Sequence, residues 1–99
     1  MTTTNYILID SNSGYIWGQA YADTPIDACR LVDEGCGASG REYVEYGPNH
    51  SILRDGLDGY LVYAAPENFR VDDGQDQSEI DAVSAMPLTA IVTCSPLEL

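Results

Sequence analysis

The chain has 99 residues, of which 44% are hydrophobic, so it is long enough for one domain with its own core. The chain has sixteen Asp and Glu residues, four arginines and no lysine, which gives a formal net charge of -12. This charge argues against direct binding to nucleic acid or to an anionic membrane surface, and it favours a basic partner.

Targeting and redox features point to the cytoplasm. The first ten residues, MTTTNYILID, lack the basic region and long apolar core of a signal peptide. No apolar run approaches the roughly 18 residues that span a membrane. The three cysteines, Cys29, Cys36 and Cys94, are an odd number at wide spacing, which is typical of reduced thiols. We expect a single cytoplasmic domain covering residues 1–99.

A β-hairpin and a helix are predicted in the first third of the chain. Residues 5–10 and 15–21 are rich in β-branched and aromatic types, and the Ser-Asn-Ser-Gly between them supplies turn residues. Thr24, Pro25 and Asp27 then form an N-terminal helix signature with a capping box. We expect this helix to end at Gly35 or Gly37. Its core-facing stripe is predicted to hold Ile26, Cys29, Val32 and Cys36, whereas Asp27, Asp33 and Glu34 are expected to face mainly water.

Three strands and a second helix are predicted in the remainder. Residues 41–47 alternate polar and apolar types, residues 59–65 form the predicted central strand, and residues 88–94 form a final buried strand. Residues 48–59 are expected to form a loop. A helix of about ten residues is predicted to start at a capping box of Ser78 and Asp81 and to stop before Pro87, with Ile80, Val83 and Met86 facing the core. The predicted order is ββαββαβ, an α+β fold with one mostly antiparallel sheet of about five strands and two helices.

The sequence holds no complete catalytic or cofactor motif. Residues 35–40 match G-x-G-x-x-G, but a predicted helix precedes them and a strand follows, which reverses the dinucleotide-binding arrangement. His50 is the only histidine, and no C-x-x-C pair is present. We therefore predict a non-enzymatic protein without catalytic residues, cofactor or metal.

The acidic segment, residues 71–81, carries five carboxylates and no basic residue: Asp72, Asp73, Asp76, Glu79 and Asp81. A helix N-terminus accounts for three of them, because carboxylates there gain roughly 0.3–1 kcal/mol each. Asp72 and Asp73 precede the helix and gain little from it. We interpret the segment as one half of an anionic binding surface. Candidates for the other half are Asp23, Asp27, Asp33 and Glu34 of the first helix region, or Glu42 and Glu45 of the strand at 41–47.

In its length, net charge and lack of lysine the chain resembles the small acidic anti-CRISPR proteins of phages and mobile elements that act as DNA mimics. The matching stretches are VDDGQDQSEID and DACRLVDEG. These proteins share no common motif, so no functional residue is carried over by position. The resemblance implies an inhibitor that occupies the basic DNA-binding site of a CRISPR effector complex, type I first, inside a bacterial host cell. It implies no membrane and no small-molecule substrate. An acidic immunity protein or antitoxin that neutralises a basic nuclease is the alternative.

Overall fold

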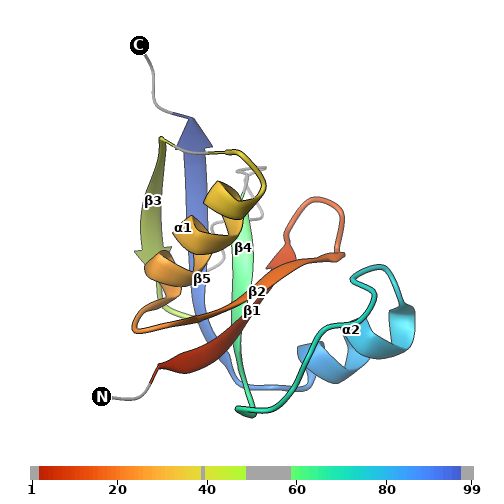
Figure 1. The fold of residues 1–99 in the computed structure, drawn as a ribbon. Coiled ribbons are helices and arrows are strands. Elements are labelled where there is room, and N and C mark those ends of the chain that lie inside the picture. The colour runs from red at the N-terminus through yellow and green to blue at the C-terminus, as the bar shows by residue number, and fades with distance from the viewer. Residues whose placement is uncertain (1–2, 39, 49–58, 97–99) are drawn as a thin grey trace.

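The computed structural model describes residues 3–38, 40–48 and 59–96. Its elements follow the predicted order: β1 (Thr4–Asp10), β2 (Ile16–Ala22), α1 (Pro25–Gly35), β3 (Arg41–Tyr46), β4 (Gly59–Ala65), α2 (Gln77–Ser84) and β5 (Leu88–Pro96). The strands form one sheet with the spatial order β2-β1-β4-β5-β3, and neighbouring strands pair antiparallel (Figure 1). The predicted α+β fold is confirmed, and β4 is its central strand.

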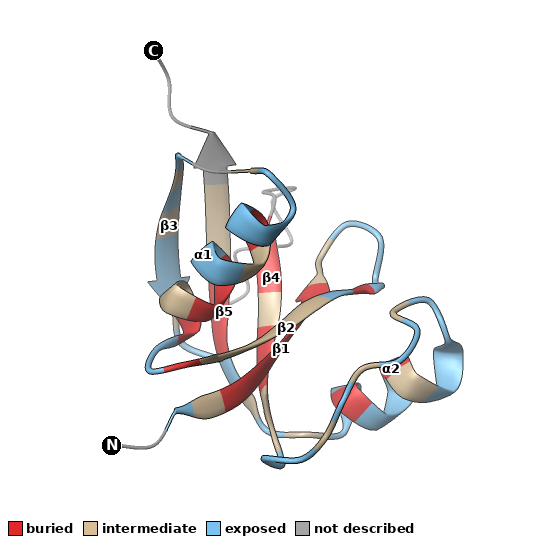
Figure 2. Ribbon diagram, in the orientation of Figure 1, coloured by how far each residue is buried: buried red, intermediate tan, exposed pale blue. Residues whose placement is uncertain are grey.

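Strand alternation divides the core into two clusters on opposite faces of the sheet. Tyr6 and Leu8 of β1 pack in one cluster with Ala28 and Cys29 of α1. The intervening Ile7 and Ile9 pack in the other, with Ile80 and Val83 of α2. The two helices therefore cover opposite faces, and the buried residues concentrate along the central strands between them (Figure 2).

Helix α1 begins and ends as the sequence predicts. The Thr24 side chain accepts a hydrogen bond from the Asp27 N–H at 3.1 Å, and Pro25 occupies the first helical position. The last helical residue is Gly35, and Gly37 follows at a φ of 84°, a left-handed conformation that favours glycine. The helix lies close to β2, because a Cβ on Gly18 would be 2.5 Å from Val32 Cγ1.

The predicted faces of α1 were partly wrong. Cys29 is fully buried as expected, but Cys36 is exposed and Asp33, expected in water, is also fully buried. Asp33 follows Cys29 by four residues, so it lies on the same helical stripe. Its burial is tolerated because neighbouring side chains supply hydrogen-bond donors to the carboxylate.

The N-cap of helix α2 lies two residues before the predicted Ser78 cap. Asp76 is the actual N-cap, and its carboxylate accepts a hydrogen bond from the Ser78 N–H at 3.0 Å. The helix has eight residues, fewer than the ten predicted. Ile80 and Val83 are buried as expected, and Met86 packs against the same cluster.

Most of the predicted loop at residues 48–59, including His50, lies outside the described residues. Within the described ranges, neither helix is long and apolar enough to cross a membrane.

Candidate functional site

The acidic segment is held against the first hairpin at two backbone positions. The Val71 N–H donates to the side-chain oxygen of Gln19 at 3.0 Å, and the Ile16 N–H donates to the Gly74 carbonyl at 2.9 Å. Gly74 has no room for a side chain, because a Cβ there would clash with the Ile16 carbonyl oxygen. These contacts fix the start of the segment against β2.

Three of the five carboxylates in the segment stabilise its own backbone. Glu79 accepts hydrogen bonds from the N–H groups of Asp72 and Asp73, at 2.8 Å and 3.0 Å. Asp76 caps α2, and Asp73 accepts a hydrogen bond from a backbone N–H within the segment. The segment is therefore a preformed turn and helix start in which Asp72, Asp73, Asp76 and Asp81 remain exposed and Glu79 is half-buried.

No ion pair among the described residues neutralises a carboxylate of the acidic segment. Within the described residues, ion pairs join Arg30 to Asp27 at 3.1 Å and Arg41 to Asp33 at 4.0 Å, and none reaches the segment. Asp81 instead accepts a hydrogen bond from Gln77 at 2.8 Å. The segment thus presents carboxylates that a basic partner could pair with.

The structure brings the five predicted residues of the acidic segment together but separates them from the other candidates. Glu34 is exposed on α1, on the opposite face of the sheet from α2. Glu42 and Glu45 are exposed on β3, whereas the acidic segment contacts β2 at the other edge of the sheet. Asp33 is fully buried, so it is not part of the candidate surface. The two helices therefore do not share one face of the sheet, and the contact of these residues with a partner stays a prediction.

Sequence reasoning missed a second site, which is organised by the buried Asp33. The indole N–H of Trp17 and the hydroxyl of Tyr60 donate to its Oδ1 at 3.2 Å and 2.7 Å. The hydroxyl of Tyr43 donates to its Oδ2 at 2.5 Å. The Arg41 guanidinium lies 4.0 Å from Oδ2. One carboxylate on α1 thereby ties together side chains from three strands.

Burial and the hydrogen bonds to Asp33 raise the pKa of Tyr43 and of Tyr60 above the ordinary range of a phenol. Both phenols therefore stay protonated and remain donors to the carboxylate. A buried carboxylate without such donors would be strongly destabilising.

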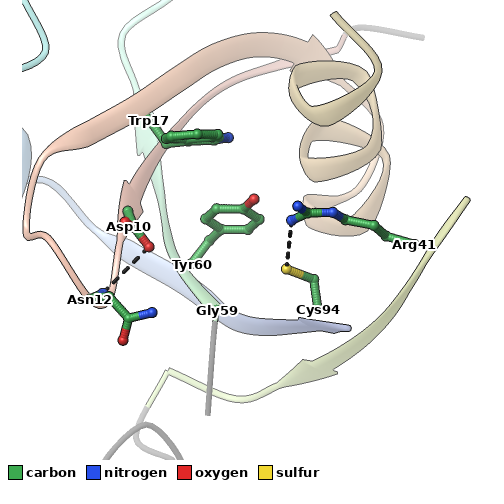
Figure 3. Close-up of a pocket in the computed structure, with 7 residues that line it drawn as sticks. All are labelled: Asp10, Asn12, Trp17, Arg41, Gly59, Tyr60 and Cys94. Carbon is green, nitrogen blue, oxygen red and sulfur yellow. Dashed lines mark hydrogen bonds between the residues drawn. The ribbon is translucent and has the colours of Figure 1, made fainter. Parts of the chain in front are cut away.

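A cavity of about 160 Å³ lies beside this network, on the face of the sheet that α1 covers. We call it the Asp33 pocket. Its lining comes from the first hairpin and from β3, β4 and β5: Asp10, Asn12, Trp17, Arg41, Gly59, Tyr60 and Cys94 (Figure 3). The strand order places Tyr60 on β4 between Asp10 on β1 and Arg41 on β3. The pocket therefore has a carboxylate on one side and a guanidinium on the other.

A β-bulge places Trp17 in the wall of the pocket. Leu8 of β1 pairs with Gly18 and Ile9 pairs with Ile16, so Trp17 is an extra residue in β2. Bulges re-aim the extra side chain, and here the indole reaches Asp33 on the α1 side. The indole N–H of Trp17 is hydrogen-bonded to Asp33. The residue is nevertheless 45% exposed, so the rest of the ring is open to solvent.

The Arg41 guanidinium has unused hydrogen-bonding capacity. Its Nη1 contacts Cys94 Sγ at 3.5 Å and lies 4.0 Å from Asp33. These two contacts involve Nη1 and leave Nη2 and Nε outside them. A guanidinium carries five N–H donors, so these two contacts use only part of its donor capacity.

Among the residues that the structure describes, no three His, Cys, Asp or Glu side chains gather into a group that could hold a metal ion. Comparisons with protein-family models, with curated proteins and with solved structures find no match to this chain.

Proposed function

We propose that this protein is a non-enzymatic inhibitor that binds the basic DNA-binding site of a CRISPR effector complex, with its carboxylates standing in for DNA phosphates. The acidic segment leads the contact in this proposal. The observation that carries it is the presentation of Asp72, Asp73, Asp76 and Asp81 as exposed carboxylates without a basic partner in the described part of the chain.

Preorganisation supports this assignment. The Glu79 carboxylate holds the backbone of Asp72 and Asp73, and Gly74 is seated on β2. The backbone that carries the exposed carboxylates is thus fixed before a partner arrives, which lowers the entropy lost on binding. A mobile acidic tail would lack this advantage.

The size of the charge group limits what it can mimic. Duplex DNA carries one charge per roughly 1.7 Å of axis, so the four exposed carboxylates match about 7 Å, or about two base pairs. Such a patch covers part of a DNA channel. Inhibition is therefore expected to come from blocking one stretch of basic side chains.

The test is competition for DNA. Purified protein is added to a type I surveillance complex with labelled target DNA, at low and high salt. We expect DNA binding to fall with added protein, and the inhibition to weaken at high salt because exposed charges are screened.

Charge reversal locates the contact. Asp72→Arg with Asp81→Arg removes two exposed carboxylates while keeping the Asp76 cap and the Glu79 contacts. Glu42→Arg with Glu45→Arg makes the same change in net charge on β3. We expect the first pair to relieve inhibition and the second to leave it in place.

Equal relief by both pairs would contradict the assignment to the acidic segment. Unchanged DNA binding across several effector complexes would refute the anti-CRISPR proposal itself. The search would then turn to a basic nuclease neutralised by an immunity protein or antitoxin, sought by pull-down with the same variants.

A further inference from the structure

We propose that the Asp33 pocket binds a small zwitterion of the amino-acid class, with the ligand carboxylate on Arg41 and its ammonium group on Asp10. This inference goes beyond the proposed inhibitor function and does not depend on it. It rests on the size, charge and construction of the pocket.

Size restricts the ligand first. A cavity of about 160 Å³ is close to the roughly 150 Å³ of an engineered cavity that holds one benzene molecule. Pockets for drug-sized ligands or nucleotides have roughly 300–1,000 Å³. The Asp33 pocket therefore accepts a molecule of about six to nine non-hydrogen atoms.

Charge then selects the class. Arg41 and Asp33 offset one another, and Asp10 adds a carboxylate on the other side of Tyr60. Arg41 still has donors for a bidentate contact with a carboxylate. A dianion such as phosphate would face Asp10 and the net charge of -12, whereas a zwitterion meets both charged groups with opposite sign.

Asp10 has acceptor capacity left for an ammonium group. Its Oδ2 accepts from the Ser13 hydroxyl at 2.9 Å, and its Oδ1 is 3.4 Å from the Asn12 N–H. A carboxylate has about four acceptor positions, so two bonds do not exhaust it. The turn contacts hold the carboxylate in place at the end of β1.

The walls of the pocket are fixed by a group that the ligand never touches. Asp33 accepts hydrogen bonds from both Trp17 and Tyr60, two of the lining residues. It is fully buried, so its role is to orient those rings. Supporting shells of this kind preorganise binding sites. The indole ring of Trp17, which is 45% exposed, then offers apolar surface to a short aliphatic side chain.

The experiment uses the full-length protein and the fluorescence of Trp17, the only tryptophan in the chain. Valine is titrated alongside 3-methylbutanoate, which lacks its amine, and 2-methylpropan-1-amine, which lacks its carboxylate. Glycine, alanine and leucine test the size limit. The indole N–H resonance of Trp17 provides a second readout, because this group donates to Asp33 beside the pocket.

We expect a saturable change with valine, and binding weaker by about tenfold or more for each one-charge analogue, since each loses a charge-assisted hydrogen bond. Arg41→Gln and Asp10→Asn are each expected to weaken valine binding to a similar extent. Arg70→Gln is the matched control, because Arg70 contacts the Tyr21 hydroxyl and the Glu67 carbonyl and does not line the pocket.

No saturable change with any of the four amino acids would overturn the proposal. Equal binding of valine and 3-methylbutanoate would also overturn it, because Asp10 would then play no part. The comparison of valine with its two analogues needs no variant, so it stands even if Arg41→Gln fails to fold. Binding of valine that persists unchanged in folded Arg41→Gln would equally contradict the assignment.

Discussion

The hydroxyl of Tyr60 lies 2.7 Å from the carboxylate of Asp33, and both residues are almost completely buried. The two come from α1 and from the central strand β4, so this hydrogen bond joins the helix to the middle of the sheet. Trp17 shares the same carboxylate oxygen, which extends the connection to the edge strand β2. A polar network thus occupies a position that a hydrophobic side chain fills in most helix–sheet contacts.

Asp33→Asn is expected to destabilise the protein by about 3 kcal/mol, because removing the charge from a buried, multiply bonded group leaves its partners poorly satisfied. The new amide NH₂ would also face the donors of Trp17 or Tyr43. Urea unfolding monitored by circular dichroism measures the change. Glu34→Gln alters the next residue, which is exposed, and should shift stability by less than about 0.5 kcal/mol. Equal midpoints for the two variants would contradict the structural role of Asp33.

Stability is expected to fall at alkaline pH. Burial, followed by the hydrogen bond to Asp33, raises the pKa of Tyr43 and Tyr60 above the ordinary value of 10.0. Burial, with the charge of Asp33, likewise raises the pKa of Cys29 above 9.0. The folded state therefore holds these protons more tightly than the unfolded chain. Their contribution is fully present below the ordinary values and is lost as pH rises above them.

Each such group removes about 1.4 kcal/mol per pH unit within that range. Urea midpoints compared at about pH 8 and about pH 11 measure the loss. Tyr43→Phe and Tyr60→Phe lower stability at the milder pH, but each should make the alkaline decline shallower, because one titrating phenol is gone. If stability fell as steeply with pH in both variants as in the parent protein, the loss could not be assigned to the phenols of Tyr43 and Tyr60.

Gly18→Ala is expected to destabilise the contact between β2 and α1 by about 1–3 kcal/mol, because the new Cβ would lie 2.5 Å from Val32 Cγ1. Adding Val32→Ala makes room and should restore part of the loss, which a double-mutant cycle measures. Gly35→Ala is the control. A Cβ there meets nothing within 4 Å, and alanine favours the helix by about 0.5–1 kcal/mol. A Gly18→Ala protein as stable as the parent would refute this packing argument.

The order and type of the elements could be predicted because each carries a local signal. The Thr24 cap, the Pro25 start and the turn before Tyr15 act over a few residues, and the structure reproduces them. The start of α2 was misplaced because Asp76 and Ser78 are both good N-caps. The structure selects Asp76, whose carboxylate accepts hydrogen bonds from both the N–H and the hydroxyl of Ser78.

The Asp33 pocket could not be predicted in the same way. The position of Asp33 one turn after Cys29 was a usable signal, but the usual preference of aspartate for water outweighed it. Tyr43 and Tyr60 meet the carboxylate only because β3 and β4 flank β5, a pairing between distant parts of the chain. The bulge at Trp17 likewise depends on the register of β1 against β2.

Glu79→Ala is expected to loosen the acidic segment without unfolding the protein. The carboxylate holds the N–H groups of Asp72 and Asp73, and hydrogen bonds to a charged group contribute about 1–2 kcal/mol when partly exposed. Hydrogen exchange at these two amides should therefore speed up by about tenfold or more.

Asp81→Ala is the matched control for this experiment. It removes a carboxylate of the same segment whose contact is with the exposed side chain of Gln77. Exchange at Asp72 and Asp73 should stay as in the parent protein. Faster exchange in both variants would assign the effect to helix α2 as a whole. Unchanged exchange in Glu79→Ala would mean that the turn is held by its contacts with β2, through Gly74 and Ile16, and not by the Glu79 carboxylate.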